Sequence, residues 1–263
     1  MRISPLCACR HFLDARPAAC DSMPMVATVE IQGSARSFLL IGDHASNLVP
    51  DGIDLRIDPD LLEQHIAIDI GVAPLGHAIC AELGCAGILG GVSRLVIDYN
   101  REIDAPGLIP LVSDGHEIRG NQLLDDAARE ERINRFWHPY HALIARRIVA
   151  EAPALLISLH SFTPQLRTSD GPRPWQVGVL YNRDERAARI AIPLLEAVGA
   201  VTGDNLPYSG KVLNATMNAH AEANSIPYLG LEIRQDLIAD EGGVRQWARI
   251  LAPVIRQTAE MLA

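Results

Sequence analysis

Polar side chains able to do chemistry follow several apolar segments of this sequence, at points where a strand is expected to end. They are His44, the pair Asn100 and Arg101, the pair His160 and Ser161, and the segment 232–234. In an open α/β sheet, sites form beyond the carboxyl ends of the strands, so we expect these side chains to converge. Imidazole, carboxylate and guanidinium groups in one place can together bind a cation, activate a water molecule and hold an anion.

His44 and His160 are the first candidates for metal ligands. Two imidazoles at two strand ends of one sheet can bind one cation, and imidazole is a common ligand of Zn²⁺. A catalytic zinc site has three protein ligands and a water molecule, so a third ligand is required. The candidates are Asn47, three residues after His44, and Asp69. Asp69 is chemically better because a carboxylate binds Zn²⁺ more strongly than a neutral amide oxygen. Its alternative role is a charge on the surface of a helix.

Glu232 ends an otherwise apolar segment. A buried carboxylate is costly unless it is paired or hydrogen-bonded. One interpretation is a salt bridge with Arg234, which lies on the same face of a strand because side chains alternate with period two. The other is a general base that takes a proton from water, with its pKa raised by burial.

Several residues are candidates for contacts with a substrate. Asn100 and Arg101 could hold a carboxylate, since a guanidinium group matches the two oxygens in a fork geometry. Arg94 is a second candidate for the carboxylate, and His220 could donate a hydrogen bond to the substrate. For each of them the alternative is an ordinary surface or structural role. Two further arginines of the long loops are weaker candidates for the carboxylate contact, Arg119 and Arg173.

The elements that must position these residues alternate between strands and helices. We expect strands at 25–31, 37–43, 86–92, 94–100, 153–161, 175–182 and 226–233. We expect helices at 59–83, about 122–151, 183–199, 214–224 and 242–263. Gly71 and Pro74 could kink or split the first of these helices. Strands separated by helices predict βαβ units, and so an α/β fold of three α/β/α layers around a mainly parallel mixed sheet.

Composition excludes some classes of partner. The chain has 263 residues, with 23 Lys and Arg against 32 Asp and Glu, which gives a formal net charge of −9. Non-specific binding of nucleic acid depends on cations that neutralise phosphates, so we expect no nucleic-acid partner. No segment approaches the roughly 18–20 apolar residues that cross a bilayer, so we expect no membrane partner. Composition leaves the oligomeric state open.

The N-terminal segment 1–25 lacks a continuous apolar stretch, which makes it a poor secretory signal. We expect it to be a disordered extension or an over-called start, with Met23 or Met25 as the true start, and 26–263 to form a single domain. Cys80 and Cys85 are the only cysteines outside this segment. Within it, Cys7 and Cys9 lack the usual two-residue spacing of zinc ligands, and the sequence has no matching second pair. A disulfide framework is therefore not expected, and a cytoplasmic location fits best.

Several segments taken together resemble the N-formylglutamate amidohydrolase family. They are 43–50, 65–76, 93–101, 113–121, 159–164, 203–208 and 231–238, in the family's order. The resemblance implies an α/β/α fold of the phosphorylase/hydrolase-like type, related to zinc carboxypeptidases. It also implies hydrolysis of N-formyl-L-glutamate to formate and L-glutamate, which is a step of histidine breakdown.

A more distant similarity to zinc carboxypeptidases suggests roles for the residues. Segment 44–47 is similar to their His-x-x-Glu ligand segment, and segment 158–161 to their Ser-x-His-Ser ligand segment. The pair Asn100 and Arg101 resembles the pair that holds a substrate carboxylate, and Glu232 resembles the catalytic glutamate. The sequence departs from this pattern at Asn47, where the carboxypeptidases have glutamate.

We therefore expect a metal-dependent amidohydrolase for a small acidic substrate, with Zn²⁺ or another divalent metal as cofactor. In this hypothesis Glu232 moves the proton from water to the departing amine, and Arg94 or His220 stabilises the tetrahedral oxyanion. One alternative is a carboxypeptidase-like enzyme or a broader N-acyl amino acid deacylase. Another is a non-catalytic protein that binds a small molecule or a metal, which the departure at Asn47 keeps open.

Overall fold

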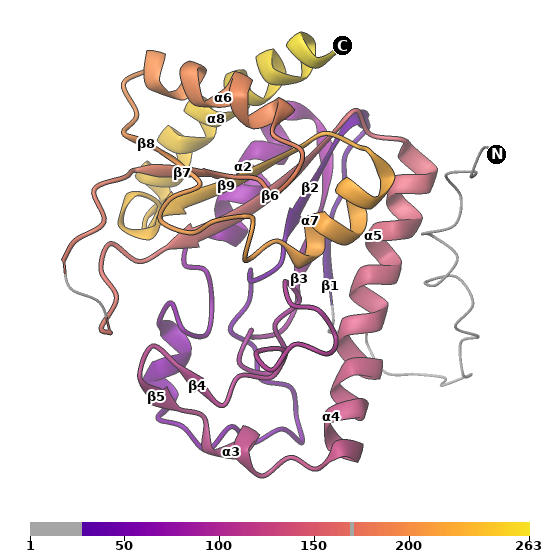
Figure 1. The fold of residues 1–263 in the computed structure, drawn as a ribbon, viewed down its shortest axis with the longest axis vertical. Coiled ribbons are helices and arrows are strands. Elements are labelled where there is room, and N and C mark those ends of the chain that lie inside the picture. The colour runs from indigo at the N-terminus through magenta and orange to yellow at the C-terminus, as the bar shows by residue number, and fades with distance from the viewer. Residues whose placement is uncertain (1–27, 169–170) are drawn as a thin grey trace.

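A seven-stranded sheet forms the centre of the computed structural model, which describes residues 28–168 and 171–263 (Figure 1). The expectation for 1–25 falls outside these residues. The strand order is β1-β3-β2-β6-β9-β7-β8. The strands are β1 (Thr28–Ile31), β2 (Ala35–Gly42), β3 (Cys85–Gly90), β6 (Leu155–Phe162), β7 (Val177–Leu180), β8 (Thr202–Asp204) and β9 (Tyr228–Arg234).

The sheet is mixed and mainly parallel, as predicted. Strands β3, β2, β6 and β9 are parallel neighbours, and β8 is parallel to β7. The antiparallel pairs are β1 with β3 and β7 with β9. The inner strands β6 and β3 are buried along their whole length, which explains why their sequences are mainly apolar.

Helices cover both faces of the sheet, which confirms the expected α/β/α layers. Helices α2, α6 and α8 pack together on one face, and α5 and α7 lie on the other (Figure 1). The α-helices are α2 (Val72–Leu83), α3 (Arg119–Gln122), α4 (Asp126–Arg132), α5 (His138–Glu151), α6 (Arg186–Ala197), α7 (Ala215–His220) and α8 (Glu241–Leu262). Short 3-10 helices are η2 (Pro59–Glu63), η4 (Glu222–Asn224) and η5 (Gln235–Leu237), and η3 (Ile133–Trp137) is a π-helical turn.

The helix predicted at 59–83 is split in two. Asp58 caps its start and Pro59 occupies the first turn, but η2 ends at Glu63. Regular helix resumes at α2, after Gly71 with a φ of 82°. A Cβ at Gly71 would lie 2.4 Å from the carbonyl oxygen of Ile238, so glycine is required there for close packing as well as for its conformation.

The residues between η2 and α2 form irregular turns that approach the end of β2. The backbone N–H of Asp69 donates to the carbonyl oxygen of His44 at 2.9 Å. Asp69 therefore lies beside the carboxyl end of β2 and not on the surface of a helix.

The strand predicted at 94–100 is wrong. This segment forms turns around Ser93, whose hydroxyl accepts from the N–H of Leu95 and whose carbonyl accepts from the N–H of Val96. Leu95, Val96 and Ile97 are fully buried without joining the sheet. Burial in the interior, and not strand pairing, accounts for their apolar character. The long helix predicted at about 122–151 begins at Asp126 and includes the π-helical turn η3.

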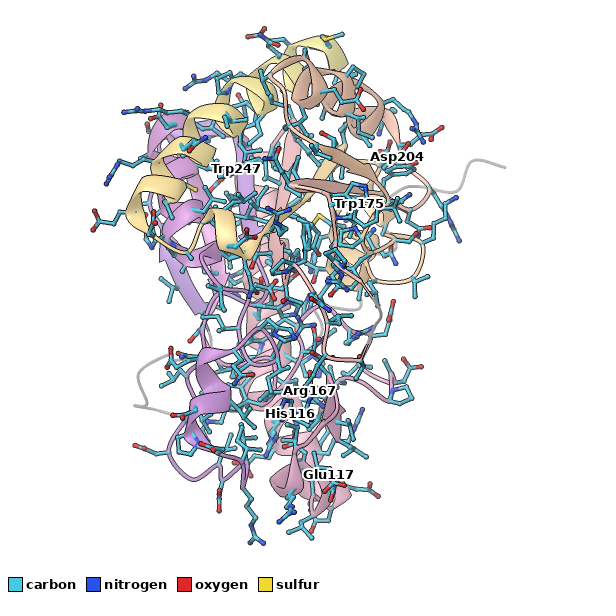
Figure 2. All side chains as sticks on the ribbon, turned by 90° about the vertical axis from the view of Figure 1, so that its left-hand side faces the viewer. His116, Glu117, Arg167, Trp175, Asp204 and Trp247 are labelled. Atoms are coloured by element: carbon cyan, nitrogen blue, oxygen red, sulfur yellow. The ribbon has the colours of Figure 1, made fainter. Side chains whose placement is uncertain are left out.

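The carboxyl ends of the central strands face a second part of the molecule, built from η2, α3, α4 and the hairpin of β4 (Val112–Ser113) and β5 (His116–Glu117) (Figure 1). The loop after β6 reaches this hairpin, where Arg167 donates to Nε2 of His116 at 2.9 Å (Figure 2). Among the described residues, no helix combines the length and apolarity that a bilayer crossing requires.

Candidate active site

A cavity of about 260 Å³ lies at the carboxyl ends of β2, β6 and β9. Its lining includes most of the residues predicted from the sequence to do chemistry, namely His44, Asp69, Arg94, Asn100, Arg101, His160 and Glu232. The expected convergence at one edge of a parallel sheet therefore occurs.

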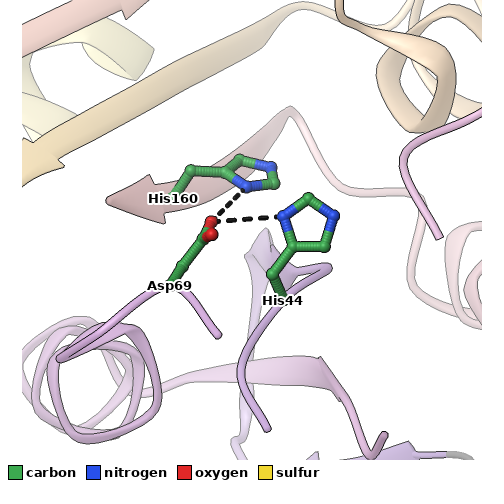
Figure 3. A group of neighbouring side chains, drawn as sticks. All are labelled: His44, Asp69 and His160. Carbon is green, nitrogen blue, oxygen red and sulfur yellow. Dashed lines mark hydrogen bonds and ion pairs between the residues drawn. The ribbon is translucent and has the colours of Figure 1, made fainter. Parts of the chain in front are cut away.

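His44, Asp69 and His160 form a buried group that could hold a metal ion (Figure 3). Nδ1 of His44 lies 3.2 Å from Oδ2 of Asp69, and Nδ1 of His160 lies 2.9 Å from the same oxygen. Two ligands about 2.0–2.1 Å from a tetrahedral metal are roughly 3.3 Å apart. The two distances to Asp69 are thus close to that spacing, and the possible ligand atoms of all three residues lie within 4.8 Å of one another.

Carboxylates face the other nitrogen of each of the two imidazole rings. Nε2 of His44 lies 2.7 Å from Oδ1 of Asp98, and Nε2 of His160 lies 3.3 Å from Oδ2 of Asp43. Histidines that bind metals usually donate their second ring N–H to a carboxylate or a carbonyl group, which fixes the ring and leaves the first nitrogen free to bind. The ring of His44 has this arrangement, and the second nitrogen of His160 faces Asp43 as an ion-pair contact.

The charges around the group fit a divalent cation. Four buried carboxylates surround the two imidazoles, those of Asp43, Asp69, Asp98 and Glu232. The neighbouring cations are Arg94 and Arg101. With neutral imidazoles, the carboxylates outnumber the two guanidinium groups, so the group carries an excess of negative charge that a bound cation would balance.

The pKa values of the two histidines respond to these carboxylates. Burial lowers the pKa of His44, and Arg94 lowers it further, but Asp98 and Asp69 raise it overall above the usual value. Burial also lowers the pKa of His160, yet hydrogen bonds to Asp43 and Asp69 raise it well above the usual value. The surroundings of each imidazole therefore favour a positive charge at the ring.

Arg94 clamps the two aspartates that contact His44. Its Nη1 donates to Oδ1 of Asp69 at 3.1 Å, and its Nη2 donates to Oδ2 of Asp98 at 2.9 Å. Burial raises the pKa of each aspartate, but His44 and Arg94 lower both well below the usual range. Both carboxylates are therefore ionised at neutral pH.

Glu232 lies opposite His160 in the register of the parallel strands β6 and β9. Burial raises its pKa to about 7, and among the described residues its Oε2 atom has no hydrogen-bond partner. The predicted alternative, a salt bridge with Arg234, does not form because Arg234 pairs with Asp236 at 2.7 Å. Glu232 thus keeps one carboxylate oxygen without a hydrogen bond and can exchange a proton near neutral pH.

Asn100 and Arg101 line the cavity on a turn after the buried segment 95–97. The side-chain oxygen of Asn100 accepts from the N–H of Thr216 at 3.0 Å, which leaves the amide NH₂ group available as a donor. Nε of Arg101 lies 3.7 Å from Oδ2 of Asp98. Both residues can therefore donate hydrogen bonds to an anion in the cavity.

Four of the candidate residues do not line the cavity, namely Asn47, His220 and the two weaker candidates Arg119 and Arg173. The side chain of Asn47 donates to Glu63 at 2.9 Å, away from the group of His44, Asp69 and His160. Nε2 of His220 lies 2.9 Å from Nδ1 of His141, in the interior beside α5. Asp69, and not Asn47, is the third member of the group that could hold a metal.

Sequence reasoning missed Asp43 and Asp98. Asp43 directly precedes His44 but points to His160 and Tyr140. Asp98 contacts His44 from 54 positions away. One weak signal for Asp98 was present in the sequence, because Asp98 is four residues after Arg94, and residues at that spacing can form an ion pair, as these two do.

Comparisons with known proteins identify the family and the fold of the chain. The family model described as N-formylglutamate amidohydrolase matches residues 36–239, most of the chain. The crystal structure of the gene product Atu2144 from Agrobacterium tumefaciens is 27% identical, with a TM-score of 0.84 over 90% of this chain and 96% of that chain. An N-formylglutamate amidohydrolase from Ralstonia eutropha JMP134 is 20% identical, with a TM-score of 0.66 over 90% of this chain and 98% of that chain, and so shares the fold. No match was found among curated proteins.

Proposed function

Because this chain belongs to the N-formylglutamate amidohydrolase family and so is a hydrolase of linear amide bonds, we propose that it converts N-formyl-L-glutamate and water to formate and L-glutamate. The observation that carries the proposal is that His44 and His160 share one oxygen of Asp69 beside the unpaired carboxylate oxygen of Glu232. We place the reaction in histidine breakdown, and the cytoplasmic location stays a prediction.

His44, Asp69 and His160 would hold a divalent metal ion, Zn²⁺ by preference, because two imidazoles and a carboxylate are a donor set that suits it. Such an ion supplies Lewis acidity to the formyl oxygen and lowers the pKa of a nearby water molecule. We give Asn47 no part in this site, because its amide is hydrogen-bonded to Glu63.

Glu232 is the proposed general base. A carboxylate with a pKa near 7 can take a proton from the attacking water and return it to the departing amine nitrogen. Its Oε2 atom is buried among the cavity residues and has no hydrogen-bond partner in the described part of the chain, so this oxygen is available to take the proton.

Asn100 and Arg101 hold the α-carboxylate of the substrate in this proposal. The fixed amide oxygen of Asn100 orients its NH₂ group, and Arg101 adds a positive charge. Arg94 keeps Asp69 and Asp98 ionised and lends positive charge to the oxyanion that develops on the formyl oxygen. His220 is assigned no such role, because it does not line the cavity.

The size of the cavity favours a substrate of this kind. Pockets for drug-sized ligands span roughly 300–1,000 Å³. A cavity of about 260 Å³ fits an acylated amino acid and leaves little room for a longer peptide.

The direct test is release of formate from N-formyl-L-glutamate by purified protein, with N-acetyl-L-glutamate assayed beside it. The Glu232→Gln variant should lose roughly 10²–10⁴-fold in turnover while it keeps its metal content, because the amide cannot take a proton. Glu63→Gln is the matched control, since Glu63 does not line the cavity, and should be as active as the unaltered protein. Near-normal turnover by Glu232→Gln would reject Glu232 as the base.

A further inference from the structure

Tyr208 and Arg173 form a polar pair at the cavity that the proposed reaction leaves without a role. Tyr208 lines the cavity on the loop after β8, and Arg173 lies on the loop between β6 and β7. Nη1 of Arg173 donates to the Tyr208 hydroxyl at 3.0 Å and to the carbonyl oxygen of Thr163 at 3.2 Å. The guanidinium group also lies over the Tyr208 ring, 4.7 Å from its centre.

Arg173 differs from the other arginines of the site in its charge balance. Arg94 pairs with two aspartates, and Arg101 is 3.7 Å from Asp98. Within residues 28–168 and 171–263, Arg173 has no carboxylate within 4.0 Å, and its polar contacts are a hydroxyl and a carbonyl oxygen. Its positive charge is therefore available to attract an anion in the cavity.

The Tyr208 hydroxyl is set up to donate. Because its oxygen accepts from Arg173, its own hydrogen is free for another acceptor, and the described part of the chain supplies none. Burial raises the pKa of Tyr208, and the charge of Glu232 raises it further, so the hydroxyl stays protonated at neutral pH. A carboxylate oxygen of a ligand is the acceptor that this donor suits.

The two residues are held in place by their loops. The Asn205 side chain accepts from the N–H groups of Tyr181 and Gly210, which encloses the Tyr208 loop. A Cβ at Gly203 would lie 2.4 Å from the carbonyl oxygen of Leu206, so this loop packs directly against β8. The backbone of Arg173 donates to the carbonyl oxygen of Pro164 at 2.8 Å. Tyr208 is thus a fixed part of the cavity lining, and Arg173 is held directly behind it by its contact with the Tyr208 hydroxyl.

We propose that Tyr208 is a specificity-determining residue that donates to the side-chain carboxylate of the substrate, and that Arg173 is a positioning residue that orients the hydroxyl and adds positive charge behind it. This inference rests on the proposed function, in which Asn100 and Arg101 take the α-carboxylate. It assigns the second carboxylate of an acidic amino acid derivative to a different wall of the same cavity.

The test compares kcat/KM for N-formyl-L-glutamate and N-formyl-L-glutamine, which differ by one charge at the distal group. Tyr208→Phe should lose roughly tenfold to hundredfold on the glutamate substrate and change little on the glutamine substrate, because a hydrogen bond to a charged group is removed. Arg173→Gln should reduce the same preference, and Arg173→Lys should restore part of it by restoring the charge.

Tyr181→Phe is the matched control. Its hydroxyl also accepts from an arginine, Arg189, but it donates to Asp204 and does not line the cavity. We expect this variant to keep the preference of the unaltered protein. Equal losses on both substrates in Tyr208→Phe would overturn the inference, because they would place the hydroxyl in the chemical step.

Calorimetric binding of the same two compounds to the Glu232→Gln variant separates this inference from the proposed function. The inference predicts tighter binding of N-formyl-L-glutamate, and loss of that preference when Tyr208→Phe is added. Equal binding of both compounds would overturn the inference, whatever the turnover. A preference in binding with no formate release by the unaltered protein would overturn the proposed function and leave the specificity assignment supported.

Discussion

Two pairs of buried histidines lie near each other in this molecule, and their surroundings are opposite in kind. His44 and His160 are surrounded by carboxylates, and their Nδ1 atoms meet at one oxygen of Asp69. His141 and His220 lie about 2.9 Å apart, Nδ1 to Nε2, and hydrogen-bond to each other. All four side chains are buried.

Aromatic rings and backbone surround the second pair. His141 packs on Trp137 with ring centres 4.0 Å apart, and its Nε2 lies 3.0 Å from the carbonyl oxygen of Tyr99. A carbonyl only accepts, so Nε2 carries the hydrogen and Nδ1 accepts from Nε2 of His220. Burial lowers the pKa of His141 to about 4 and, with the help of His141, that of His220 to about 3.

The comparison separates burial from function. Burial by itself makes a histidine neutral and structural, as at His141 and His220. Carboxylates beside both ring nitrogens favour the protonated imidazole instead and create a site for positive charge, as at His44 and His160. Asp43 lies at the boundary between the carboxylates around His160 and the aromatic rings of α5, since it faces His160 and accepts a hydrogen bond from Tyr140.

The same substitution in each pair should give the largest contrast. His160→Asn removes a ring nitrogen aimed at the proposed metal, so we expect loss of bound metal and about 10³-fold or more of formate release. His220→Asn keeps a side-chain donor toward His141, so we expect activity within about threefold and unchanged metal content. Elemental analysis and the formate assay on both variants provide the measurement. Equal losses in the two variants would remove the distinction between the pairs.

A smaller effect is expected from the carboxylate behind His44. Asp98→Asn keeps a hydrogen-bond acceptor but loses the charge, and such changes typically cost about 10–100-fold in metal affinity. Competition with a chromophoric chelator measures that affinity. Asp125→Asn is the control, since this residue caps α4 and asparagine caps equally well. Unaltered affinity in Asp98→Asn would show that the negative charge of Asp98 beside His44 contributes nothing to metal affinity.

The smallest effect concerns stability and pH. Because the folded pKa values of His141 and His220 lie below the unfolded value of 6.5, the unfolded chain takes up more protons between about pH 6 and pH 4. These groups therefore reduce stability as pH falls, by up to about 1.4 kcal/mol per pH unit each. Urea unfolding of His220→Asn at several pH values should show a shallower decline than the unaltered protein. An equally steep decline would contradict the lowered pKa of His220.

The sequence predicted the parts of the site that depend on sheet geometry. His44, His160 and Glu232 follow strands β2, β6 and β9 or end them, and parallel strands bring such positions together. The position of Asp69 was less predictable, because helical spacing suggested a helix where Gly71 requires an irregular turn. Asp69 was still preferred over Asn47, on ligand chemistry alone.

Long-range contacts were beyond the reach of local patterns. Thr216 donates to Asp43 from 173 positions away, and His141 meets His220 from 79 positions away. No periodicity encodes such pairs, since they depend on how α7 packs against α5 and against the end of β2. The strand prediction at 94–100 failed for a related reason. A turn packed in the interior and a strand in a sheet both require apolar residues, so the sequence does not distinguish them.

Metal content measured together with turnover tests the central claim most directly. We predict that the purified protein binds one divalent ion per chain, that a chelator removes both the ion and formate release from N-formyl-L-glutamate, and that added Zn²⁺ restores the activity. Full activity in protein shown to contain no metal would contradict the account.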